Sequence, residues 1–221
     1  MRYTIVASLI GLAVLTSPAF ADLYSGQLTG GGGGLTGTGS WDSSATKLTW
    51  TVSQNANLTW HYLYTFEVAE KALSNIVIQV SDTFTNFDFL PGSVTGDGSF
   101  EVLRVFTSLT GAPEPVYMNA LKFSSFNEGT AWTIAFDTRR APMWGDFWAK
   151  DGKEVIAPQE PQIPVLTYNS GFGALPIGQR YNNDFVGPFI SVPDTRVPIP
   201  AAVLLGLLGL GAAGLKLRKF A

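Results

Sequence analysis

The pattern of hydrophobic and polar positions has a period of two in the first half of the chain. Between residues 47 and 53, and again between 58 and 68, apolar side chains alternate with polar ones, as in a strand with one face against a core. The polar stretch Gln54-Asn55-Ala56-Asn57 separates the two runs, so together they predict a long hairpin. Its outer face carries His61, the only histidine of the chain. Its inner face carries Leu48, Trp50, Val52, Leu58, Trp60, Tyr62, Tyr64, Phe66 and Val68.

Further short apolar runs follow this hairpin, each bounded by Gly, Pro, Asn or Asp. They cover residues 76–80, 100–106, 121–123 and 132–136. Short strands separated by turn residues, in a chain with 24 glycines and 13 prolines, are typical of antiparallel all-β domains. We therefore expect an all-β fold over residues 41–192, either an antiparallel β-sandwich or a jelly roll.

A glycine-rich segment precedes the first alternating run. Residues 30–34 are consecutive glycines, and ordering a glycine costs more conformational entropy than ordering any other residue. We expect residues 22–40 to form a flexible or loosely packed lead-in to the domain. The segment contains the pattern Gly-x-Gly-x-x-Gly, but no apolar strand precedes it and no helix follows it, so a dinucleotide site is not expected.

The stretch from Arg139 to Glu154 is the most distinctive internal part of the sequence. If residues 144–150 form one strand, its face carries Trp144, Asp146, Trp148 and Lys150, and Asp151-Gly152 makes the next turn. Two tryptophans flanking a carboxylate can stack on a sugar ring and accept its hydroxyls, so Trp144, Asp146 and Trp148 are a candidate glycan platform. The alternative is that one or both tryptophans fill the core, with the charged side chains solvated at its rim.

The carboxylates of the same stretch allow a third interpretation. Asp146, Asp151 and Glu154 could supply the acid and the base of a glycoside hydrolase, whose mechanism depends on a separation that a sequence does not show. The chain has no Gly-x-Ser-x-Gly motif, no complete calcium-binding loop and no cysteine. We expect no enzymatic activity, no cofactor and no bound metal.

The N-terminus has the features of an export signal. Met1-Arg2 precedes an apolar run from Ile5 to Leu15, and Ala19 and Ala21 are the small residues that a signal peptidase requires. Residues 1–21 therefore predict a secretory signal peptide that is cut after Ala21.

The C-terminus predicts a short hydrophobic membrane helix. Residues 197–215 carry no charge, and the basic residues Lys216, Arg218 and Lys219 follow them. Because prolines at 198 and 200 delay the helix until about residue 201, its length would be about 22 Å, against a hydrocarbon core of about 30 Å. The basic tail should stay cytoplasmic, with the rest of the chain across the membrane.

Residues 193–221 resemble the sorting signal of bacterial PEP-CTERM proteins, in which a proline-spaced motif, a hydrophobic span and a basic tail follow one another. The motif here consists of Val197, Pro198, Ile199, Pro200 and Ala201, and is closest to the variant Val-Pro-Leu-Pro-Ala, which lacks an acidic residue. The resemblance implies recognition by an exosortase-like membrane protease, export, and association with the envelope or with extracellular polysaccharide. The alternative is a plain single-pass anchor, with small residues at helix-contact spacing.

A second resemblance involves the distinctive internal stretch. Uncharacterised members of the same group carry the segment Asp-Arg-Ala-Pro-Val-Trp-Gly-Asp-Phe-Tyr-Ala-Lys-Asp-Gly, followed downstream by Asn-x-Gly-Phe. Residues 140–152 of this chain are similar to that segment, and Asn169-Ser170-Gly171-Phe172 is similar to the downstream motif. This resemblance implies no known activity.

The net charge of the predicted exported part argues against some classes of binding partner. Removal of both ends takes away four of the 14 basic residues and none of the 17 acidic ones, which leaves a formal charge of minus seven. Such a charge argues against nucleic acid and anionic lipid as partners. We expect an exported protein of the envelope or extracellular matrix with a structural or adhesive role. A carbohydrate-binding module is the first alternative.

Overall fold

The structure is a computed structural model that describes residues 23–96, 99–103, 119–124, 129–155, 158, 161–174 and 187–196. Over these residues the chain forms thirteen strands and two short 3-10 helices. Every pairing between the named strands is antiparallel. The prediction of an all-β, antiparallel fold is therefore confirmed.

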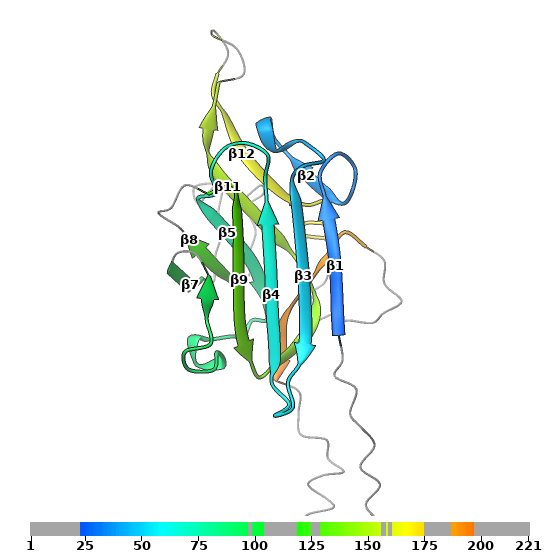
Figure 1. Cartoon of the computed structure of the whole chain (residues 1–221), viewed down its shortest axis with the longest axis vertical. Helices are drawn as coiled ribbons and strands as arrows, with labels where there is room; N and C mark the ends of the chain where they lie inside the picture. The colour runs from blue at the N-terminus through cyan, green and yellow to red at the C-terminus, as the bar shows by residue number, and fades with distance from the viewer. Residues whose placement is uncertain are drawn as a thin grey trace, which may run out of the picture.

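One sheet has five strands in the order β1-β3-β4-β9-β6 and lies at the front of Figure 1. Its strands are β1 (Leu23–Thr29), β3 (Lys47–Gln54), β4 (Trp60–Glu67), β6 (Thr95–Gly96) and β9 (Ala131–Thr138). The predicted hairpin is β3 and β4, in which Gln54 pairs with Trp60 and Lys47 pairs with Glu67. β9 pairs along the whole length of β4, so the aromatic residues of β4 lie in the middle of the sheet.

A second sheet has six strands in the order β2-β12-β11-β5-β8-β7 and lies behind the first in Figure 1. Its strands are β2 (Leu35–Gly37), β5 (Asn75–Val80), β7 (Ser99–Leu103), β8 (Asn119–Ser124), β11 (Phe147–Glu154) and β12 (Ile163–Asn169). A small third sheet joins β10 (Arg140–Gly145) to β13 (Ile190–Arg196).

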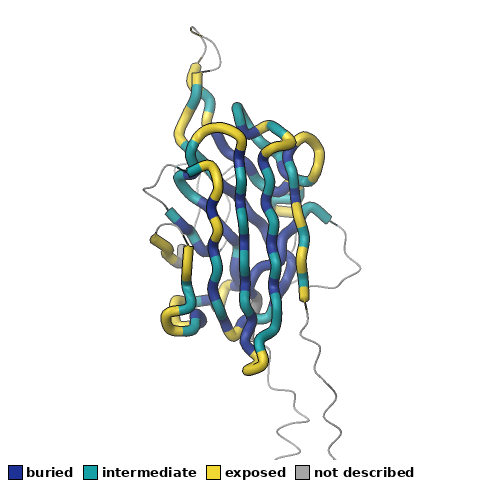
Figure 2. The backbone as a smooth tube through the Cα atoms, in the orientation of Figure 1, coloured by how far each residue is buried: buried dark blue, intermediate teal, exposed yellow. Residues whose placement is uncertain are grey.

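The core lies between the sheets and is strongly aromatic, as the dark inner strands of Figure 2 indicate. The predicted stripe of Trp60, Tyr62, Tyr64 and Phe66 is buried. Leu58, predicted to continue the same face, is 74% exposed because it lies in the turn before β4 begins. Phe136 of β9 stacks on Tyr62 with ring centroids 5.2 Å apart. The buried tyrosine hydroxyls donate hydrogen bonds to backbone carbonyls of the third sheet, at 3.0 Å from Tyr62 and 2.7 Å from Tyr64. This arrangement of two antiparallel sheets around one core is consistent with a β-sandwich.

The glycine-rich lead-in is part of both sheets, so the prediction of a loosely packed segment is wrong. β1 pairs with β3, β2 pairs with β12, and the 3-10 helix η1 (Gly39–Trp41) follows with its tryptophan fully buried. Between the strands, Gly31, Gly32 and Gly34 have positive φ, a conformation that residues with a Cβ rarely adopt. The glycines therefore build the tight connection that carries the chain from one sheet to the other.

The structure also corrects the strands predicted near the two tryptophans and at the end of the domain. β10 ends at Gly145 and β11 begins at Phe147, so residues 144–150 do not form one strand. β11 continues through Asp151-Gly152, where a register shift replaces the predicted turn. β13 extends to Arg196, past the predicted boundary at residue 192. The third sheet accommodates Pro193, which faces Pro142 across the ladder.

The predicted signal peptide and the predicted C-terminal sorting signal lie outside the described residues. This holds for the signal peptide with Ala19 and Ala21, and for the sorting motif and basic tail within residues 197–221. In the part of the chain that the structure describes, no helix is long and apolar enough to cross a membrane.

Candidate binding site

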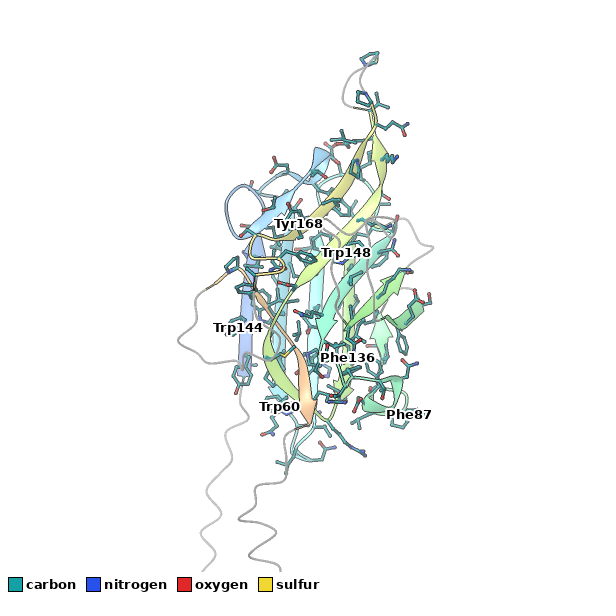
Figure 3. All side chains as sticks on the ribbon, turned by 180° about the vertical axis from the view of Figure 1, so that it is seen from behind. Trp60, Phe87, Phe136, Trp144, Trp148 and Tyr168 are labelled. Carbon is teal, nitrogen blue, oxygen red and sulfur yellow. The ribbon has the colours of Figure 1, made fainter. Side chains whose placement is uncertain are left out.

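The candidate glycan platform does not form, because Trp144 and Trp148 lie in different sheets and both are buried. Trp144 is 8% exposed and belongs to the main core, whereas Trp148 is 0% exposed. Trp148 belongs to a small cluster on the outer side of the six-stranded sheet, where Tyr168 packs beside it (Figure 3). The chain changes sheet at Asp146, so the alternation of faces does not continue across this residue. Trp144 and Trp148 therefore do not share an exposed face. Trp144 packs in the main core, as the alternative expected, but Asp146 is buried and not solvated at the rim.

Asp146 joins the two parts of the second resemblance. Its side chain is buried, and its two oxygens accept hydrogen bonds from Asn169 Nδ2 at 2.8 Å and from the Gly173 amide at 2.9 Å. Asn169 Oδ1 in turn accepts from the Phe147 amide at 2.8 Å. Burial raises the pKa of the Asp146 carboxyl, although these hydrogen bonds partly oppose the increase. The Asp-Phe and Asn-x-Gly-Phe segments therefore form one hydrogen-bonded unit that fixes the turn after β12.

The other two predicted carboxylates are also engaged within the fold. Asp151 accepts a hydrogen bond from Ser74 Oγ at 2.8 Å, and Glu154 accepts one from the Ser40 amide at 2.6 Å. Among the described residues, no group of three His, Cys, Asp or Glu side chains is placed to hold a metal ion.

His61 lies on the outer face of the five-stranded sheet, as predicted. It sits between Ser53 of β3 and Asp137 of β9 in the strand register. Its Nδ1 lies 2.6 Å from Asp137 Oδ1, but no hydrogen bond among the described residues joins it to Ser53. The cross-strand pair therefore has the geometry of an ordinary partly exposed ion pair or hydrogen bond on a sheet surface.

A hollow that the sequence patterns did not predict lies beside the 3-10 helix η2 (Asn86–Asp88), at one end of the molecule. Its volume is about 510 Å³. Phe87 is 90% exposed at its edge (Figure 3), and Phe100 of β7 is 40% exposed. The lining, which we call the η2 pocket, consists of Asn86, Phe87, Phe89, Leu90, Pro91, Gly92, Val94, Phe100 and Arg139.

A buried ion pair holds the η2 turn in place. Arg140 Nη2 donates to Asp88 Oδ2 at 2.7 Å and to the Thr83 carbonyl at 2.6 Å, and the Thr85 amide donates to the same Asp88 oxygen at 2.8 Å. Burial would raise the pKa of Asp88, but the hydrogen bonds and charge of Arg140 and the bonds from Thr85 together lower it to about 2. Phe84 packs against the guanidinium, 5.6 Å from its carbon atom.

Two hydrogen bonds with residues of β9 also hold the η2 turn. The Leu90 amide donates to the Asp137 carbonyl at 2.9 Å, and Thr138 Oγ1 donates to the Asp88 carbonyl at 2.8 Å. Hydrogen bonds therefore hold the turn that carries Phe87 on both sides, and its ring is exposed to solvent. One sequence signal was available: Thr85 and Asp88 have the spacing of a capping box, which marks the start of a helical turn.

Comparisons with known proteins add no family to this description: no family model, no curated protein and no solved structure matches the chain.

Proposed function

We propose that the protein is an exported β-sandwich with a structural or adhesive role, and that the η2 pocket is its contact site. The observation that carries the proposal is the exposure of Phe87 on a turn that Arg140 and Asp88 hold rigidly. A single exposed apolar residue is ordinary on a protein surface. Here Phe87 and Phe100 line one hollow together with Arg139, and an apolar hollow with a charged rim is the usual form of a protein contact site.

The buried ion pair supports this interpretation. Bringing two charges out of water costs free energy that their attraction only partly returns, so a buried pair is weak evidence for a gain in stability. The Arg140–Asp88 pair instead holds the η2 turn, on which Phe87 is the neighbour of Asp88 in the chain. A rigid contact group loses little conformational entropy when a partner binds.

The location in this proposal rests on the sequence. The N-terminal signal and the PEP-CTERM-like tail favour export, sorting by an exosortase-like system, and a position at the envelope or in the extracellular matrix. The exported part is acidic and has no cysteine. The carbohydrate-binding alternative loses its platform, since Trp144 and Trp148 are buried in separate clusters.

The test replaces Phe87 by Ser in cells that export the protein, with Leu58→Ser as the control. Leu58 is also an exposed apolar residue, 74% exposed, but it does not line the η2 pocket. We expect Phe87→Ser to lower the fraction of protein retained in the envelope and matrix, with an unchanged melting temperature, and Leu58→Ser to lower neither. Equal retention of both variants and the wild type, measured by immunoblot of cells and medium, would contradict the contact site.

A further inference from the structure

We propose that β1 is an interaction surface, at which two copies of this chain pair edge to edge across a two-fold axis. This inference does not involve the η2 pocket, so it goes beyond the proposed function. Among the described strands, β3 is the only one that pairs with β1, which is therefore an edge of the five-stranded sheet (Figure 1). An edge strand presents N–H and C=O groups with which a further strand can pair.

The hydrogen bonds at the end of β1 show which of its backbone groups face outward. The Gly30 amide, one residue beyond the strand, donates to the Thr46 carbonyl at 2.9 Å, on the side of β3. The Thr29 amide donates away from β3, to the Gly33 carbonyl at 2.9 Å. Backbone groups alternate in direction along an antiparallel strand. Even-numbered residues of β1 therefore bond to β3, and odd-numbered residues point away from it.

Three residues of β1 leave these outward groups unbonded. Leu23, Ser25 and Gln27 are exposed, and no described residue bonds to their N–H and C=O groups on the side away from β3. Folded proteins usually protect such an edge with a charged side chain, a proline or a bulge. β1 contains no charged residue and no proline, and its register with β3 is regular.

The other edges of the described sheets are short or protected. β2 has three residues and β6 has two. β7 carries Glu101, which pairs with Lys122 of β8. β10 and β13 contain Pro142 and Pro193. Among the described edge strands, β1 is therefore the one best suited to accept a further strand.

The positions of the unbonded groups favour a second copy in one register. A two-fold axis pairs the same surface of both copies and makes the two strands antiparallel. With Ser25 on the axis, Leu23 lies opposite the partner's Gln27, and all the outward groups of these residues are bonded. With Gly26 on the axis, Leu23 would instead face the partner's Thr29, whose amide is already bonded. Pairing at Ser25 joins the two five-stranded sheets into one continuous sheet.

The side chains on the inner face suit the same register, in which Tyr24 lies opposite the partner's Gly26. Tyr24 is half-buried and packs beside Trp60, with ring centroids 5.8 Å apart. Gly26 has no side chain, and the ring of Trp50 covers it so closely that an added Cβ would overlap the ring. The partner's strand therefore meets a flat aromatic surface at this position, and it covers more of Tyr24.

The first experiment places charges on the axis and measures self-association of the exported protein by sedimentation velocity over a range of concentrations. We expect a monomer–dimer equilibrium for the wild type. Ser25→Lys and Ser25→Glu each bring two like charges together and should weaken the dimer about tenfold or more. An equimolar mixture of the two variants should recover the dimer, because opposite charges then face each other. The control Thr133→Lys changes an exposed residue of β9, on the same outer face but away from this edge, and should leave the equilibrium unchanged.

The second experiment blocks the hydrogen bonds. Ser25→Pro removes an N–H that points away from β3, so pairing with β3 is kept while the ring obstructs a further strand. We expect a monomer at concentrations where the wild type is a dimer. Melting temperatures at low concentration, where all the proteins are monomers, check that each variant is folded. Amide hydrogen exchange of residues 23–29 should slow at high concentration in the wild type and not in Ser25→Pro.

Three results would overturn the pairing at β1. They are a wild type that stays monomeric at every concentration, a dimer that persists in Ser25→Pro, and a mixture of Ser25→Lys and Ser25→Glu that associates no better than either variant alone. The first result would leave the edge of β1 open to an extended segment of another protein.

Discussion

At the scale of the residue, the surroundings of two buried aspartates shift their carboxyl pKa values in opposite directions. Asp88 faces the guanidinium of Arg140, and its pKa falls to about 2 because the charged form is paired. Asp146 receives only neutral hydrogen-bond donors, so burial dominates and its pKa rises. Asp88 therefore contributes stability that is present above the ordinary aspartate pKa of about 3.9 and is lost as the pH falls through about 2. The stability that Asp146 contributes has the opposite dependence on pH, because its pKa is raised.

Asp146→Asn tests this dependence. The amide keeps one acceptor oxygen and replaces the other by a donor, so either Asn169 or Gly173 loses its acceptor at a cost of about 1 to 3 kcal/mol. Because the folded pKa of Asp146 is raised, the stability that its carboxyl contributes is complete below the ordinary pKa and is lost as the pH rises through the folded pKa. The difference between wild type and variant should therefore shrink as the pH rises. Urea unfolding of both proteins at a series of pH values measures this difference in the free energy of unfolding. A difference independent of pH would contradict the raised pKa.

At the scale of the element, β4 shows the clearest separation of two faces. One face is aromatic and buried between β3 and β9, and the other carries His61, Leu63, Thr65 and Glu67 at intermediate exposure. The separation persists because β4 is a central strand, paired on both edges along its full length. An error of one residue in register would place every aromatic ring of the strand in solvent.

Neighbouring substitutions on β4 test the separation. Trp60→Ala should lower the free energy of unfolding by about 3 to 5 kcal/mol, because it removes a buried ring in contact with the core. His61→Ala should lower it by less than about 1 kcal/mol, because its pair with Asp137 is partly exposed. Chemical denaturation compares the two variants, and similar losses for both would mean that the register is wrong.

At the scale of the whole molecule, the proposed function rests on the two ends of the chain and on the η2 pocket of the folded domain. The predicted signal peptide and the predicted sorting signal occupy the termini of the sequence, whereas the η2 pocket lies on the folded domain. The two sheets enclose one core that is rich in aromatic residues. Under the proposed function, the termini direct the molecule to the cell surface and the η2 pocket makes a contact there.

Processing of the chain provides a test at this scale. We expect the mature protein to begin at Asp22, because Ala19 and Ala21 satisfy the signal peptidase. We expect the extracellular form to lack Lys216, Arg218 and Lys219, because the hydrophobic span is short for a permanent anchor and its motif resembles a sorting signal. Intact-mass analysis of protein from cells and from medium measures both ends. A complete C-terminal tail in all of the membrane fraction, with none released, would leave only the plain anchor.

The sequence by itself determined the fold class and the β3–β4 hairpin, because alternation with period two reports directly which side chains leave water. It also identified Asp146 and Asn169 as parts of related motifs, without showing that they touch. Only the tertiary structure decided the rest. Trp144 and Trp148 are buried in separate clusters because the chain changes sheet between them. Gly31, Gly32 and Gly34 form a turn because β1 and β2, which flank them, pair with strands of different sheets. The η2 turn beside the pocket is held by Arg140, which reaches Asp88 from fifty-two residues away in the chain. Local sequence patterns carry no information about contacts between residues so far apart in the chain. The burial of side chains, their hydrogen-bond partners and the pockets are therefore determined only when the sheets assemble.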